Sequence, residues 1–275
     1  MTISRHIILL KAGITVSFLM LTVFVIFARD TLPVYGDLVR QAPQRSVSGF
    51  ITGLLPFPAP YVAFASIGTS VLFAFVSQVL LFYFFEKTQA IEVRLLGTFL
   101  FSFTFEILRI VTPLKTVMHL SGYIPAITSH FMVFGRFYGL FALFAAGLYV
   151  SGLKIRREET VIFPMATAAL LFALRMPIDS FYYDTSLYPI TGFSRTFGTL
   201  NIVIIMLSIL CFISGAYTRG SREYYFIALG VLAVAIGRRL LLTADTWVIL
   251  GAGAVFLFFG TWYAGIQFRR MYLWS

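Results

Sequence analysis

The sequence predicts an all-α polytopic membrane protein with about eight transmembrane helices arranged as hairpins and both termini in the cytoplasm. Three observations lead to this fold class. The 275 residues are 59% hydrophobic and 12% charged, a composition too apolar for a soluble domain of this length. The apolar runs are continuous rather than alternating, which excludes a transmembrane β-barrel. Basic residues gather in the loops of one side.

Eight apolar runs are each close to the ~20 residues that a helix needs to cross a bilayer. We expect them to form one integral membrane domain over residues 1–275, in which residues 29–59 form a long outer loop. The first run follows two basic residues and so resembles a signal peptide. It lacks a small-x-small cleavage pattern, so we expect it to be retained. The expected helices cover residues 10–28, 60–85, 94–113, 130–153, 160–177, 195–217, 223–243 and 247–268.

The loop charges predict the orientation. With the N-terminus inside, the outer loops hold Arg29, Arg40, Arg45 and Lys115. The inner segments hold more basic residues, as cytoplasmic loops do, which places both termini in the cytoplasm and the protein in the cytoplasmic (inner) membrane. Their charge suits anionic lipid headgroups. These inner residues are Arg5, Lys11, Lys87, Arg94, Lys154, Arg156, Arg157, Arg219, Arg222, Arg269 and Arg270.

Two of the expected helices begin with related sequences, which indicates an internal repeat. Both follow the pattern Phe-small-Arg-x-aromatic-Gly-x-apolar, starting at Phe134 and at Phe193. The preceding helices also end alike, with Leu-Arg-Ile around Arg109 and Leu-Arg-Met around Arg175. We expect duplicated hairpins over 94–153 and 160–217, with 223–268 as a diverged third copy. A chance match in a chain rich in Phe and Gly is the alternative.

Six arginines are expected at the outer ends of these helices, where basic residues are normally scarce. Each could extend separately to the lipid headgroups, or they could converge on a shared pocket that opens outward. All are arginine rather than lysine, and the guanidinium fork matches carboxylate or phosphate. We therefore favour a pocket for an anion. The six are Arg109, Arg136, Arg175, Arg195, Arg238 and Arg239.

Few other polar residues accompany these arginines. Glu106 lies three residues before Arg109 and so on the same helix face, as an internal counter-ion or, alternatively, a proton carrier. Asn201 offers a neutral polar lining for the pocket. Arg238 and Arg239 point about 100° apart, so at most one of them faces a common pocket. The tyrosine-rich loop 179–188 would either close over a ligand or lie in the interfacial belt.

Motifs for nucleotide binding, serine hydrolysis or zinc proteolysis are missing from the sequence. His119 and His130 flank one outer loop without an acidic or thiol partner. We therefore assign no catalytic residue and expect no metal, no cofactor and no nucleic acid.

We favour a ligand-sensing or ligand-binding module that recognises a carboxylate, a phosphate or a lipid headgroup through the arginine pocket. It would lie in the lipid bilayer and act through a separate protein partner or as a homo-oligomer. The alternatives are a transporter or permease subunit for an anionic solute or lipid, and a scaffold whose arginines meet a partner's acids. An intramembrane lipid-modifying enzyme is a further alternative, with Glu106 or a histidine as its acid–base group.

Overall fold

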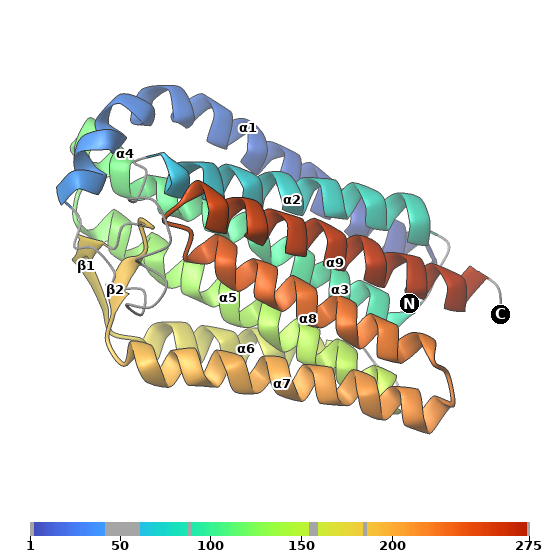
Figure 1. The fold of residues 1–275 in the computed structure, drawn as a ribbon. Coiled ribbons are helices and arrows are strands. Elements are labelled where there is room, and N and C mark those ends of the chain that lie inside the picture. The colour runs from blue at the N-terminus through green and yellow to red at the C-terminus, as the bar shows by residue number, and fades with distance from the viewer. Residues whose placement is uncertain (1–2, 42–60, 87–89, 154–158, 184–185, 274–275) are drawn as a thin grey trace.

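The computed structural model describes residues 3–41, 61–86, 90–153, 159–183 and 186–273. In this part the chain is almost entirely helical, which confirms the predicted all-α class (Figure 1). One segment is a 3-10 helix, η1, and a small β-hairpin joins two of the helices. The elements are α1 (Ile3–Gln41), α2 (Val62–Phe85), α3 (Ile91–Phe101), η1 (Ser102–Ile110), α4 (Val111–Met118), α5 (Tyr123–Val150), α6 (Glu159–Arg175), β1 (Ile178–Tyr183), β2 (Pro189–Thr191), α7 (Ser194–Arg219), α8 (Glu223–Leu242) and α9 (Trp247–Leu273).

The helices run up and down along one bundle axis (Figure 1). Within the described residues, 7 helical segments are long and apolar enough to cross a membrane, and α3, η1 and the start of α4 together form one of them. The shorter α6, with 17 residues, packs against α5. The described residues thus confirm a polytopic helical membrane protein with 7 long apolar helices, one fewer than the eight expected, because α6 is shorter. The start of α1 and the end of α9 lie at the same end of the bundle (Figure 1), which we call the terminal end.

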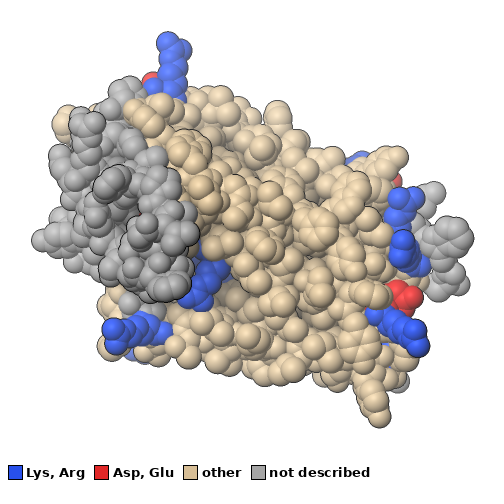
Figure 2. All heavy atoms as spheres, viewed as in Figure 1, with Lys and Arg blue, Asp and Glu red and all other residues tan. Residues whose placement is uncertain are grey.

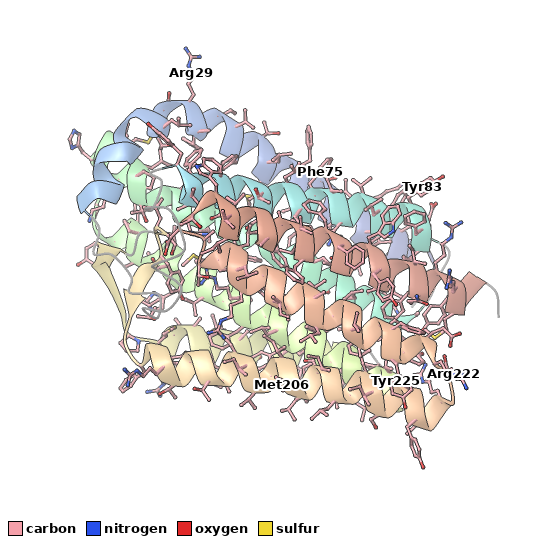
Figure 3. The ribbon with its side chains drawn as sticks, in the orientation of Figure 1. Arg29, Phe75, Tyr83, Met206, Arg222 and Tyr225 are labelled. Carbon is pink, nitrogen blue, oxygen red and sulfur yellow. The ribbon has the colours of Figure 1, made fainter. Side chains whose placement is uncertain are left out.

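The surface has the composition of a protein dissolved in lipid. In Figure 2 the visible Lys, Arg, Asp and Glu side chains gather toward the two ends of the bundle, with a broad uncharged belt between them. Large apolar side chains such as Phe163 on α6 and Leu210 on α7 are exposed. Arg222 and Tyr225 lie at the terminal end, whereas Arg29 projects from α1 near the other end (Figure 3). A helical bundle satisfies its backbone hydrogen bonds internally, as such surroundings require.

Glycines bring α8 and α9 into backbone contact. A Cβ atom at Gly237 would lie 2.8 Å from the Gly253 carbonyl oxygen, and one at Gly230 would lie 3.0 Å from the Gly260 carbonyl oxygen. Each helix therefore carries two glycines seven residues apart on the face that meets the other helix. Lipid offers no hydrophobic drive for helix association, so this close approach supplies van der Waals contact instead.

The element boundaries differ from the sequence prediction at several places. Helix α1 continues to Gln41, past the expected start of the outer loop at residue 29, and residues 42–59 of that loop lie outside the described residues. Helix α5 begins at Tyr123 rather than near residue 130. Hydropathy marks where a chain leaves the lipid, which is not where a helix must end. A further difference is the antiparallel β1–β2 hairpin, in which Ile178 pairs with Thr191. Pairing satisfies backbone groups of a segment expected to be a loop.

Candidate functional site

The site is built on η1, a 3-10 interruption of the helix formed by α3 and α4. Side chains three residues apart are eclipsed in a 3-10 helix, so Phe103, Glu106 and Arg109 share one face. All three are buried, with exposed fractions of 1%, 1% and 2%. Ser102 and Phe105 point instead toward α5. The 3-10 geometry thus places the carboxylate of Glu106 beside the guanidinium of Arg109 inside the bundle.

Two glycines let α5 approach η1. A side chain at Gly135 would overlap the ring of Phe105, and one at Gly139 would overlap Ser102. The small-xxx-small spacing of these glycines is typical of close helix contacts in membranes. This approach places Arg136, which follows Gly135 on α5, directly against Glu106.

Arg136 and Glu106 form a bidentate ion pair. The Arg136 Nε donates to Glu106 Oε1 at 2.7 Å, and an NH2 group of the same guanidinium donates to Oε2 at 2.6 Å. The Tyr188 ring lies over the guanidinium at 4.2 Å from its centroid, a favourable cation–π contact. Side-chain exposure is 16% for Arg136 and 1% for Glu106. The pair therefore occupies both carboxylate oxygens with one arginine.

Arg109 lies on the other side of Glu106 and connects three elements. Its NH1 group is 3.8 Å from Glu106 Oε2 and donates to Ser66 Oγ on α2 at 3.3 Å. Its NH2 group donates to the main-chain carbonyl of Ser186, between β1 and β2. Arg109 thereby ties the hairpin to the helical core.

Arg238 reaches the cluster from α8 without a carboxylate of its own among the described residues. It is 6% exposed, and its NH2 group donates to the Arg136 carbonyl at 3.4 Å. The guanidinium lies over the rings of Phe99 and Phe103, at 5.3 and 5.0 Å from their centroids. Its NH1 group is buried with no hydrogen-bond acceptor in the part of the chain that the structure describes. That group lies near Gly139, on the face of α5 against which Ser102 packs.

The structure brings together three of the six arginines predicted to share a pocket. The side chains of Arg175, Arg195 and Arg239 are exposed instead. Arg239 is one residue from the buried Arg238, and so faces another direction, as expected. In the alignment that defines the predicted repeat, Phe172 stands where Glu106 stands, so the second copy has no acid to gather its arginines. The ligand-binding roles of all six, and the repeat itself, stay predictions.

Asn201, the predicted neutral lining residue, is not joined to the cluster. It is half-buried on α7, and its side-chain oxygen is buried without a hydrogen bond to any described residue. No hydrogen bond within the described ranges connects it to Arg136 or Arg238. Its role as a ligand contact also stays a prediction.

The segment between the two strands contributes more than a surface loop would. Ser186 and Leu187 are 1% and 2% exposed, and Leu187 packs against Phe64 and Ile110 with a left-handed backbone (φ 56°). Sequence reasoning left this region either as a lid or as part of the aromatic belt. A polar segment with an apolar residue at its tip was the available signal, but nothing in the sequence showed that Leu187 enters the core.

A second polar cluster lies at the terminal end, where the exposed Arg219 contacts buried partners, and the sequence analysis did not find it. Arg219 on α7 donates to Tyr224 Oη on α8 at 2.7 Å, to the Tyr149 carbonyl on α5 at 2.7 Å and to Glu92 Oε1 on α3 at 3.4 Å. Tyr272 on α9 also hydrogen-bonds Glu92. This cluster joins five helices through groups that satisfy one another, so a structural role accounts for it. Within the described residues, no group of three or more His, Cys, Asp or Glu side chains could hold a metal ion.

Comparison with known proteins gives one partial match, and its description names no function. Over 89 residues the chain is 33% identical to a protein of Treponema pallidum (strain Nichols) described as an uncharacterized protein. The match covers 32% of this chain and 26% of that protein, so the chain spans about a quarter of the relative's length. No family model and no solved structure matches the chain.

Proposed function

We propose that this protein is a membrane-embedded binding module for an anionic ligand, which it holds between Arg238 and Arg136. The ligand would be a carboxylate, a phosphate or the headgroup of an anionic lipid. The observation that carries the proposal is Arg238, a buried guanidinium whose NH1 group has no acceptor among the described residues. Both oxygens of Glu106 are already bonded to Arg136. An oxyanion bound at Arg238 would give this guanidinium a counter-ion of its own, which the described residues do not supply.

The free energies of these interactions favour a bound ligand, because the contacts of Arg238 within the protein do not offset the cost of burying its charge. Removing an ion from water costs several kcal/mol even after relaxation. A cation–π contact returns about 0.5–2 kcal/mol, and a neutral hydrogen bond about 0.5–1.5 kcal/mol. The contacts of Arg238 with Phe99, Phe103 and the Arg136 carbonyl therefore leave part of the cost unmatched. Because Arg238 is buried in the bundle, it does not extend to the headgroups as an isolated lipid-facing arginine would.

Native mass spectrometry of the gently solubilised protein tests the proposal. The variant is Arg238→Gln, and the matched control is Arg239→Gln, the exposed neighbour on the same helix. We expect a discrete added mass on the wild type and the control that is absent from Arg238→Gln. Isothermal titration with inorganic phosphate and with acetate then separates the free anions from a lipid headgroup. The same adducts on all three proteins would refute the proposal.

The binding module would act through a separate protein partner or as a homo-oligomer. The alternative of transport makes a different prediction: liposome uptake of an anionic solute should then depend on Arg238. An enzyme using Glu106 would instead show turnover that is lost in Glu106→Gln. Neither alternative is favoured by a contact in the cluster, since Glu106 is fully occupied by Arg136.

We also propose that the terminal end faces the cytoplasm, because the predicted inner loops carry the larger share of Lys and Arg. Arg222 lies at that end (Figure 3), whereas Ser121 lies between α4 and α5 at the other. A membrane-impermeant maleimide should label Ser121→Cys in spheroplasts, and Arg222→Cys after permeabilisation. The reverse pattern would invert the orientation.

A further inference from the structure

A groove lies between α2, α3 and α9, away from the arginine cluster and on the half of the bundle that carries the start of α1 and the end of α9. Its volume is about 600 Å³, within the ~300–1,000 Å³ of typical small-molecule sites. Its lining is almost wholly apolar, and it includes one charged side chain among the described residues, that of Arg269. The groove therefore suits a long apolar group with a single anionic end.

The length of the groove matches one leaflet of a bilayer. Along α9 its lining runs from Phe258 to Arg269, and along α2 from Phe73 to Phe85. At 1.5 Å per residue these stretches are about 17–18 Å long. Half of a ~30 Å hydrocarbon core is about 15 Å. Both stretches begin near the middle of their helices and end at the terminal end, so the groove occupies one leaflet.

The two ends of the groove differ in chemistry. Its deep end is closed by aromatic rings, where Phe73 meets Phe258 edge-on at 5.1 Å between centroids and Phe103 at 5.0 Å. The end of the groove nearest the terminal end of the bundle holds Arg269, whose guanidinium lies 5.1 Å from the centroid of the Phe84 ring. This contact keeps the cation at the mouth of the groove, at the level where lipid headgroups lie.

We propose that the groove binds one acyl chain of an anionic glycerophospholipid from the leaflet at the terminal end, with the lipid phosphate at Arg269. An arginine matches a phosphate by charge and by the geometry of its donors. A zwitterionic lipid has the same acyl chains, but its headgroup is attracted less strongly to Arg269. The charge of the headgroup therefore favours an anionic lipid in the groove. This site is separate from the proposed anion site at Arg238, and neither depends on the other.

Two pairs of variants test the binding of the lipid acyl chain and of the lipid headgroup separately. Gly265 lines the groove, and a Cβ atom there would meet nothing within 4 Å, so the backbone admits a side chain and Gly265→Leu places it in the groove. Gly251→Leu is the matched control, because that glycine is equally open and lies outside the groove. Arg269→Gln removes the charge at the mouth, and Arg270→Gln removes the neighbouring charge that does not line it. Circular dichroism verifies that each variant is folded.

The assay is native mass spectrometry of delipidated protein in detergent, titrated with phosphatidylglycerol and with phosphatidylcholine of the same chains. The wild type should retain phosphatidylglycerol roughly fivefold better, as expected for one basic residue near an anionic headgroup. Gly265→Leu should weaken that binding roughly tenfold, equal to displacing about two buried methylene groups. Gly251→Leu should behave as wild type. Arg269→Gln should remove the preference between the lipids, and Arg270→Gln should keep it.

Several results would overturn the proposal. Equal binding of both lipids to the wild type would refute the contact between the phosphate and Arg269. Unchanged phosphatidylglycerol binding to Gly265→Leu would refute the groove as the site of the acyl chain. Equal losses in Arg269→Gln and Arg270→Gln would reduce the effect to general surface charge. Gly265→Leu should leave the adduct that depends on Arg238 unchanged. A failure of the Arg238 proposal is therefore distinguishable from a failure of this one.

Discussion

Replacing Glu106 by glutamine should lower the free energy of unfolding by about 3–5 kcal/mol, the usual cost of breaking a buried ion pair by removing one partner. The substitution keeps the shape of the side chain and removes its charge. Arg136 then loses its bidentate carboxylate, with N–O distances of 2.6 and 2.7 Å. Arg109, whose NH1 group is 3.8 Å from the same carboxylate, loses part of its compensation too.

Coulomb's law gives a similar magnitude for this ion pair. Two unit charges about 4 Å apart interact by about 4 kcal/mol at an effective dielectric constant of about 20. Glutamine retains one carbonyl oxygen that still accepts a hydrogen bond from Arg136, which places the expected loss toward the lower end of the range. The Glu106 side chain is 1% exposed, so water does not reach this position to solvate the arginines in place of the carboxylate.

Reversible unfolding in mixed detergent and SDS micelles, followed by far-ultraviolet circular dichroism, measures this loss. Glu86→Gln is the matched control, because its carboxylate is half-exposed at the end of α2, and its effect should stay within about 0.5 kcal/mol. The double variant Glu106→Gln/Arg136→Gln should lose about 1–3 kcal/mol less than the sum of the two single losses. A loss below about 1 kcal/mol for Glu106→Gln, as at an exposed ion pair, would refute the reasoning.

Two further predictions concern the packing of the bundle and use the same unfolding assay. Gly237→Leu should cost about 1–3 kcal/mol by overpacking, because a Cβ atom there already lies 2.6 Å from the Leu257 amide nitrogen. Gly251→Leu, in open space, should have no comparable effect, and equal losses would contradict the close contact. Arg219→Gln should cost about 1–3 kcal/mol by leaving buried partners unbonded. Arg222→Gln removes a charge that takes no part in these hydrogen bonds and should be nearly neutral, and a similar loss there would contradict the role of the Arg219 contacts.

The transmembrane helices were predictable because one physical constraint dominates them. A chain in lipid must satisfy its own backbone hydrogen bonds, so a continuous apolar run of suitable length becomes a helix. The expected runs 60–85 and 223–243 therefore agree closely with α2 and α8. The extension of α1 to Gln41 was not predictable in this way. Beyond the lipid a polar segment is free to be helix or loop, and hydropathy does not distinguish them.

The candidate site was predictable in its residue types and only partly in its geometry. The small-xxx-small spacing of Gly135 and Gly139 is of the kind that favours close helix packing, and the spacing of Glu106 and Arg109 indicated a shared face. The same reasoning grouped Arg175 and Arg195 with them, yet both side chains are exposed. Depth in the membrane can be read from position along a helix. The direction of a side chain depends on the rotation of that helix, which its neighbours decide.

The sequence by itself determined the environment of this protein, its helical class and the approximate level of each arginine, because hydropathy and charge depend on residue type and order. Only the tertiary structure decided which charges meet. The 3-10 turn of η1 stacks Glu106 beside Arg109, and the glycine face of α5 brings Arg136 within hydrogen-bond distance of Glu106. Helix α8 then places Arg238 against the Arg136 carbonyl. Such contacts depend on helix rotation and separation, which arise from the packing of all the helices together.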